Sequence, residues 1–321
     1  VFDQALDAAK EAGAEFVSIF NVAAYYDIMP MPDIRFYGDP MSLNDDQLTI
    51  FVNLAHGKGL QFCLQEQVAA YDFLTPADEM DSIWIPHTVE WWNKWFSDYK
   101  LYLLDQVKLA DSIGIEIVQL MQFAEFTFKD EYPQYDQKWR EIIQEVKMHF
   151  SGKIGLSTYI GPLFTGKLTF LDELDIYIPS IATLGGGFPI SGLSNPYNPS
   201  LTELTVKFNE YFDLLENIVT EQDTIYIQFT VASWDGQNNF EFLEPPVPSQ
   251  RDFQEQVDYY EAFFQTIMNR TFIKGVFVER MAWFERLIPS PGYEYFDQRS
   301  STSMRNKPAE IALKLWFETY K

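Results

Sequence analysis

Short apolar runs alternate with longer segments of helical period along this chain, and this alternation constrains the fold more than any other feature. The runs are rich in β-branched and aromatic residues, which favours strands. The predicted strands are 16–21, 60–65, 115–120, 153–157, 174–178, 225–229 and 275–278. Strands that alternate with helices in this way are typical of βα units and a parallel sheet.

The predicted helices are 45–58, 89–112, 137–149, 201–219 and 252–268, with a first helix at 2–12 and a last one at 308–320. The first helix ends at Gly13, as a helix C-cap should. We expect an α/β protein, a single (β/α)8 TIM barrel domain over residues 1–321. Seven strands are one short of a barrel, so we expect the first strand to be upstream of Val1 or missing; otherwise the barrel is open or completed by another chain.

Insertions follow the predicted strands, where barrel enzymes keep their active-site loops. They cover residues 29–45, 69–90, 185–199, 233–250 and 282–307. Such loops would build a deep cleft at the C-terminal ends of the strands.

The composition narrows the class of partner. The chain has 47 acidic residues against 23 Lys and Arg, so phosphate backbones and anionic membrane surfaces are repelled, and we expect no nucleic acid partner. No apolar stretch approaches the length of a membrane span, so we expect no membrane insertion. The sequence does not predict an oligomeric state.

Metal sites and cofactors are not expected. Cys63 is the single cysteine, and the three histidines show no metal-binding spacing. Aromatic residues make up 17% of the chain, which exceeds what a core needs and suits a cleft in which sugar rings pack on flat side chains.

Glu125 is the leading candidate for a proton donor. It follows the run IEIVQLMQ near the end of the fourth barrel strand, between Phe123, Ala124 and Phe126. A partly apolar setting raises the pKa of a carboxyl group and suits a general acid. The alternative is a solvated loop glutamate.

Four stretches carry a resemblance to a known family. They are ALDAAKEAGAEFVSIF, LAHGKGLQFCL, the aromatic segment WWNKWFSDYKLYLLDQVKLADSIGIEIVQLMQFAEF, and RNKPAEIALKLWF. In this order and spacing the chain resembles clan-A glycoside hydrolases, most of all the β-mannanase-like family 113. The resemblance implies an endo-acting, retaining hydrolase of a β-linked polysaccharide such as mannan. It places an acid/base after strand four, which Glu125 matches, and a nucleophile after strand seven.

The nucleophile position does not match the family. The stretch IYIQFTVASWDG is similar to the family's strand seven, but Gln228 stands where a glutamate is expected, and an amide is not a competent nucleophile. Either a glutamate was exchanged for glutamine, which is a common way to trap substrate, or the natural protein has lost or relocated its nucleophile. If it was relocated, Glu279 after the last predicted strand is the leading candidate, and Trp283 beside it would be a platform under the sugar. A structural pair between Glu279 and Arg280 is the alternative.

Further residues near strand ends are candidates for contacts with sugar hydroxyls or rings. They are Asn21, Gln65, Gln122, Tyr159, Tyr177 and Trp234. For each of them, ordinary barrel packing is the alternative. Asp27, Glu66 and Asp175 are acidic groups at or just beyond strand ends, which we interpret as hydrogen-bonding or loop residues, with a catalytic role as the alternative. His56 is interpreted as structural.

Two functions follow from these observations. The first is a glycosidase acting on an oligo- or polysaccharide, without a cofactor and located outside the cytoplasm, extracellular or periplasmic. The second is a barrel without catalysis that binds glycans or serves as a structural subunit. Gln228 favours the second function, and Glu125 and the aromatic cleft are compatible with both.

Overall fold

The computed structural model describes residues 2–36, 42–69, 75–79, 82, 85–122, 135–159, 169–182, 193–195, 198–219, 224–231, 233, 252–278, 304 and 307–319. These residues belong to two compact units. The first unit spans residues 15–158 and 166–177, and the second spans residues 1–14, 159–165 and 178–321.

The first unit contains the strands β1 (Phe16–Asp27), β2 (Asp33–Phe36), β3 (Gln61–Ala69), β4 (Ile117–Gln122) and β5 (Lys153–Tyr159). Their order is β2-β1-β3-β4-β5. The pairs β1–β3, β3–β4 and β4–β5 are parallel, whereas β2 is antiparallel to β1, with Phe36 opposite Ala23.

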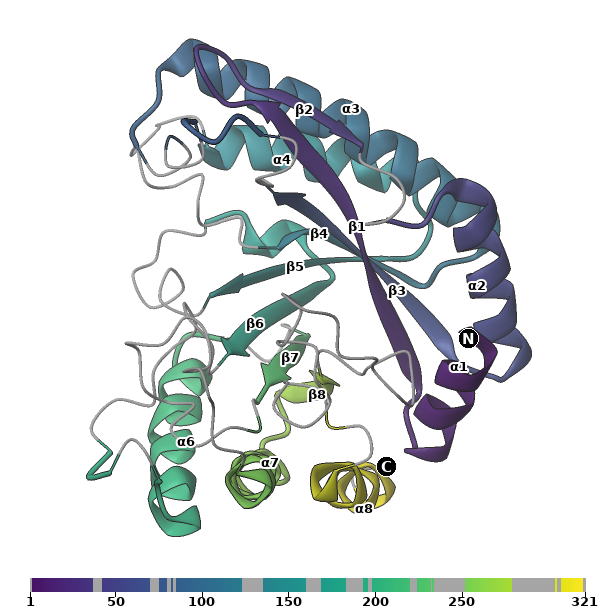
Figure 1. Ribbon diagram of the computed structural model, residues 1–321. Coiled ribbons are helices and arrows are strands. Elements are labelled where there is room, and N and C mark those ends of the chain that lie inside the picture. Colours follow the sequence, from purple (N-terminus) through teal and green to yellow (C-terminus); the bar gives the residue numbers. More distant parts are fainter. Residues whose placement is uncertain are drawn as a thin grey trace. The chain divides into compact units, whose positions relative to one another are not determined.

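The helices of the first unit are α2 (Asp45–Gly57), α3 (Val89–Ile113) and α4 (Tyr135–Lys147), with a 3₁₀ turn η3 at Leu171–Glu173. They lie on one side of the strands (Figure 1). The start of α2 is fixed by a capping box, in which Asn44 accepts from the Gln47 amide at 2.9 Å and the Gln47 side chain accepts from the Asn44 amide at 3.0 Å. Gly114 ends α3 with a φ of 79°, which favours glycine.

Aromatic side chains form the contact between α3 and its neighbours. Trp91, Trp92, Trp95 and Trp139 are all buried. The indole N–H of Trp95 donates to the Tyr25 hydroxyl of β1 at 2.6 Å, and that of Trp91 donates to the Ile28 carbonyl at 2.6 Å. These four tryptophans therefore belong to the core and not to a sugar cleft.

The second unit contains α1 (Phe2–Glu11), most of β6 (Ile176–Ala182), α6 (Leu201–Glu216), β7 (Ile225–Thr230), α7 (Phe253–Ile267), β8 (Ile273–Val278) and α8 (Pro308–Thr319). The strand order is β6-β7-β8, and β7 is parallel to β8, with Ile225 opposite Ile273. The ring of Phe229 on β7 stacks on Phe263 of α7 with 4.2 Å between centroids, so the helices cover one face of β7.

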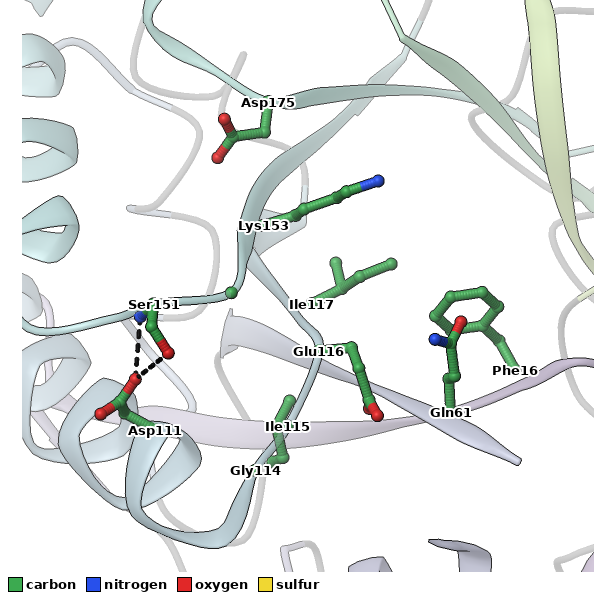
Figure 2. A pocket seen from close by; sticks show the side chains of 11 residues that line it. Phe16, Gln61, Asp111, Gly114, Ile115, Glu116, Ile117, Ser151, Lys153 and Asp175 are labelled. Atoms are coloured by element: carbon green, nitrogen blue, oxygen red, sulfur yellow. Dashed lines mark hydrogen bonds between the residues drawn. The ribbon is translucent and has the colours of Figure 1, made fainter. Parts of the chain in front are cut away.

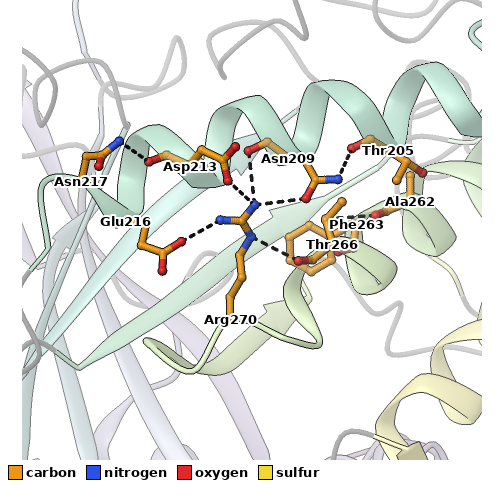
Figure 3. A network of polar contacts seen from close by, with 9 residues as sticks. All are labelled: Thr205, Asn209, Asp213, Glu216, Asn217, Ala262, Phe263, Thr266 and Arg270. Carbon is orange, nitrogen blue, oxygen red and sulfur yellow. Dashed lines mark hydrogen bonds and ion pairs between the residues drawn. The ribbon is translucent and has the colours of Figure 1, made fainter.

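Arg270, just after α7, joins α7 to α6 (Figure 3). Its guanidinium donates to the Thr266 carbonyl of α7, and on α6 to the carbonyl and side chain of Asn209 and to the carboxylates of Asp213 and Glu216, at 2.6–3.3 Å. The Arg270 side chain is 11% exposed, whereas its carboxylate partners Asp213 and Glu216 are 65% and 59% exposed, so the network lies at the edge of the α6–α7 contact.

The α/β fold and all seven predicted strands are confirmed, and so is the helix end at Gly13, whose φ is 89°. The bounds differ most at β1, β3 and β6, which extend to Asp27, Ala69 and Ala182 instead of ending at residues 21, 65 and 178. The antiparallel strand β2 was not predicted, because its four residues lie inside a segment interpreted as an insertion. The expectations of one domain and of a strand before Val1 stay predictions.

Candidate functional site

Gln228 is the fourth residue of β7 and lies two residues before the strand ends. Phe229 points toward α7, and neighbouring residues of a strand point to opposite faces, so Gln228 lies on the face opposite the helices. Its side chain is 0% exposed, and Phe277 of β8 stands opposite it in the sheet. This is the face and the strand end at which a barrel enzyme presents a catalytic side chain.

The chain leaving β7 is fixed by α7. The side-chain amide of Gln256 donates to the Val231 carbonyl at 2.9 Å, and the Asp252 amide donates to the Ser233 carbonyl at 3.0 Å. Val231, Ser233 and Gln256 are all fully buried. The segment immediately after Gln228 is therefore held to the N-terminal end of the next helix.

Gln65 and Gln119 lie on the face of the first unit opposite the helices. Phe62 packs edge-on against Phe51 of α2, with 5.3 Å between ring centroids. Gln65 is three residues further along β3, and because side chains alternate between the two faces, it points away from α2. Gln119 stands opposite it on β4. Both are buried, and Gln65 donates to the Ser18 hydroxyl. Gln65 was predicted near a strand end, but β3 continues to Ala69, so it lies in the middle of its strand.

Asn21 and Glu66 stand opposite each other on β1 and β3 and point toward α3. The Asn21 side chain donates to Gln106 at 2.7 Å, and the Tyr102 hydroxyl donates to the Glu66 carboxyl group. Burial raises the pKa of Glu66 to about 8, although the hydrogen bond from Tyr102 acts in the opposite direction. Both side chains serve the contact between strands and helix, and β1 continues past Asn21, which was predicted near its end.

Asp175 and Tyr177 lie at the opposite end of a strand from the one predicted. The sequence predicts a strand over 174–178, but β6 runs from Ile176 to Ala182, so Tyr177 is its second residue. Asp175 precedes the strand and accepts from the Ile154 amide at 2.9 Å. The shift arises because residues 171–173 form the turn η3, which delays the strand. The interpretation of Asp175 as a hydrogen-bonding residue is confirmed.

Several predicted site residues lie outside the described residues. They are Glu125, Trp234, Glu279 and Trp283. Gln122 and Tyr159 are the last residues of β4 and β5, as expected for strand-end positions, and their side chains are likewise outside the description. Their proposed roles stay predictions.

A pocket of about 570 Å³ lies in the first unit at the N-terminal ends of the strands (Figure 2). It is lined by the first residues of four parallel strands, Phe16, Gln61, Ile117 and Lys153. At one edge, Ser151 donates both its amide and its hydroxyl to Asp111 at 2.8 Å (Figure 2). Barrel enzymes carry their chemistry at the other strand ends, so we assign this pocket to the scaffold.

The other carboxylates of the pocket also bind backbone amides. Glu116 accepts from the Phe62 amide at 2.7 Å, in the same way as Asp175 accepts from Ile154. The ring of His56 lies 3.2 Å from Glu116, which confirms the interpretation of His56 as structural. These acids therefore satisfy backbone amides at or beside the strand starts, which is a structural role.

Among the helices of the described residues, none combines the length and apolar character that a membrane span needs. Within the same part of the chain, no three His, Cys, Asp or Glu side chains stand close enough to share a metal ion.

Comparison with known families identifies the chain. Residues 2–291 match the family model of Glycoside Hydrolase Family 113. The chain belongs to this family. Its members are glycosidases, and a carbohydrate is therefore the substrate class of this family 113 protein.

Solved structures with a similar fold include other members of family 113. A β-mannanase of the family from Alicyclobacillus acidocaldarius is 18% identical, with a TM-score of 0.71, over 100% of this chain and 92% of its own. A family 113 β-1,4-mannanase is 20% identical, with a TM-score of 0.73, over 99% of this chain and 93% of its own. A family 5 mannosidase from Rhizomucor miehei is 10% identical, with a TM-score of 0.64, over 99% of this chain and 87% of its own.

These structures confirm the predicted (β/α)8 barrel, and the family match confirms the resemblance to family 113. Among curated proteins, no sequence matches this chain.

One buried polar residue near β7 was not among the candidates predicted from the sequence. Lys307, in the stretch RNKPAEIALKLWF, donates to the Ser233 hydroxyl at 2.9 Å and is only 5% exposed. A charged residue directly before a helix that begins with proline is a weak signal, because it is equally typical of an exposed turn.

Proposed function

We propose that this family 113 protein is a retaining, endo-acting hydrolase of a β-linked polysaccharide, with mannan as the first candidate. Membership of the family makes the protein a glycosidase. The finer assignment is supported by the solved family members, two of which are described as β-1,4-mannanases. We also propose an extracellular or periplasmic location, since the substrate is a polymer; fractionation of the natural host, with detection by antibody, tests this.

The placement of residue 228 carries the proposal. It is buried on the face opposite the helices, near the end of β7, at the position where the resemblance to the family implies a glutamate. Glu125 follows β4 by three residues and is proposed as the acid/base. In retaining glycosidases the two carboxyl groups lie roughly 5–5.5 Å apart on either side of the anomeric carbon.

The reaction would run in two displacements. A carboxylate at position 228 attacks the anomeric carbon, while Glu125 donates its proton to the leaving oxygen, and a covalent glycosyl-enzyme forms. Glu125, now ionised, then removes a proton from a water molecule that displaces the carboxylate. Gln228 carries no charge, so the chain needs either a glutamate at 228 or Glu279 as the nucleophile.

A second function is favoured by the amide of Gln228 itself. A barrel that keeps the cleft but lacks a nucleophile would bind glycans or serve as a structural subunit. The two functions differ in one measurable property, which is whether bound oligosaccharide is cleaved.

Hydrolysis of β-mannan, β-glucan and galactan oligomers by four chains tests the proposal. They are the chain as given, Gln228→Glu, Gln228→Glu with Glu125→Gln, and a Gln144→Glu control on the exposed side of α4. We expect the Gln228→Glu chain to cleave mannan oligomers, and the added Glu125→Gln change to abolish cleavage. NMR of the first product anomer then tests retention.

Cleavage by the chain as given, lost on Glu279→Gln, would assign the nucleophile to Glu279. Binding of oligomers without cleavage by any of the four chains contradicts the hydrolase and supports the glycan-binding barrel.

A further inference from the structure

Lys307 stands at a position that the physics of helices and of burial both disfavour for a lysine. It directly precedes Pro308, the first residue of α8, where the positive end of the helix dipole repels a cation and where Ser, Thr, Asp or Asn is preferred. Its side chain is 5% exposed, although lysine is almost never buried without specific contacts. Its contacts must therefore offset the free-energy cost of burying a lysine at this position.

Two contacts of Lys307 lie at the two ends of one connection. Its ammonium donates to the Ser233 hydroxyl at 2.9 Å, just after β7. It also lies 5.9 Å from the ring centroid of Phe253, the first residue of α7, within cation–π range. Residues 234–251 between these two contacts lie outside the described residues. One ammonium group thus joins the start and the end of the β7–α7 connection.

The same connection is what fixes the end of β7. The Ser233 carbonyl accepts from Asp252 at 3.0 Å, and the Val231 carbonyl accepts from Gln256 at 2.9 Å. The first bond comes from Asp252, the N-cap of α7, and the second from the first turn of this helix. Lys307, directly before α8, adds an anchor from a third part of the chain, and it is charged, so its hydrogen bond is stronger than one between neutral groups.

We propose that Lys307 is a positioning residue for position 228, which it holds in place through Ser233 and Phe253. This inference depends on the proposed function. Residue 228 is five residues before Ser233 in the chain, and it lies in β7, which ends at Thr230, three residues before Ser233. Displacement of a reacting group by about 1 Å costs roughly 100-fold in rate, so the stiffness of this strand end matters for catalysis.

Amide hydrogen exchange measures the anchor without requiring activity. Lys307→Met removes the ammonium and retains the length of the side chain, and Lys314→Met removes the same charge from the exposed side of α8 as the matched control. We expect peptides covering residues 225–233 to exchange about tenfold faster in Lys307→Met, because local opening becomes easier, and to be unchanged in Lys314→Met. Peptides from α6 and β8 should not change in either variant.

Kinetics of the same substitutions in the Gln228→Glu chain measure positioning. We expect Lys307→Met to lower kcat by roughly 100-fold while KM stays within about twofold, because a displaced nucleophile weakens the transition state and not substrate binding. If Lys307→Met does not fold, Ser233→Ala removes the acceptor and should change exchange and kcat in the same direction.

The outcomes are distinct. Equal exchange of residues 225–233 in Lys307→Met and Lys314→Met would overturn the proposal, as would faster exchange spread evenly over the unit, since that indicates general stability. An unchanged kcat in an active Gln228→Glu chain would overturn it too. If no chain cleaves any oligomer, the proposed function and the catalytic role of Lys307 both fail, and the exchange data still decide whether Lys307 anchors the strand end.

Discussion

Tyr102 of α3 donates its hydroxyl hydrogen to the carboxyl group of Glu66 on β3, and the two side chains are 7% and 0% exposed. Burial raises the pKa of Glu66 to about 8 from its ordinary value of 4.5, so this group is a neutral acid at pH 7. Its register neighbour Asn21 also points toward α3 and donates to Gln106, so two buried polar contacts join β1 and β3 to this helix.

Glu66→Gln should remove a pH dependence of stability. The folded protein binds this proton more tightly than the unfolded chain does, so the free energy of unfolding falls as pH rises from 4.5 to about 8. The loss is about 1 kcal/mol per pH unit, and glutamine does not ionise. In urea unfolding at pH 5, 6.5 and 8, the free energy of unfolding of the variant should rise relative to that of the parent as pH rises. Glu318→Gln on α8 is the control, and parallel curves for Glu66→Gln and the parent would contradict the prediction.

Tyr25→Phe should destabilise the protein because it leaves a buried indole N–H without its acceptor. The Tyr25 hydroxyl accepts from Trp95 at 2.6 Å, and an unsatisfied buried donor costs about 1–3 kcal/mol. Tyr26→Phe, on the next residue, keeps the ring over which Arg35 lies at 5.0 Å and should cost much less. Equal unfolding free energies for the two variants would show that the Trp95 bond contributes nothing.

Arg270→Met should loosen α6 from α7, because five acceptor atoms lose their donor (Figure 3). Hydrogen bonds to charged groups contribute about 1.5–3 kcal/mol, so we expect a loss of about 2 kcal/mol in thermal or urea unfolding. Lys207→Met removes a pair within α6, with Glu210 at 2.9 Å, and should cost under about 0.5 kcal/mol. A loss for Arg270→Met no larger than for Lys207→Met would rule out the network as a stabilising contact.

Gly152→Ala should be destabilising although Gly152 needs no unusual backbone angle. A Cβ atom there would lie 2.6 Å from the Glu116 carbonyl oxygen and 2.6 Å from the Phe150 ring. Overpacking of this kind costs about 1–3 kcal/mol. Gly57→Ala at the end of α2 meets nothing within 4 Å and should be neutral or stabilising. The order of the two melting temperatures is the test, and the reverse order contradicts it.

The sequence predicts local structure well, because strands rich in β-branched residues and helices of clear period depend on near neighbours. It predicts less well to which face of the sheet a side chain points. Asn21 and Gln65 both follow apolar runs, yet one points toward α3 and the other to the opposite face, and only the register of β1 and β3 decides this. Lys307 received no role because its partner Ser233 is 74 residues away. Contacts between residues so far apart in the sequence cannot be predicted from the spacing of residue types.

The bonds of Glu116 and Asp175 to the amides of Phe62 and Ile154 have a consequence for engineering. Each acid sits at or just before the start of one strand and holds the strand beside it, so neighbouring strands are tied together at the ends where they begin. Loops that follow the strands can then be exchanged or lengthened without touching these ties. We expect such grafts to be tolerated in the first unit, with new substrate preferences introduced on a scaffold that keeps its own register.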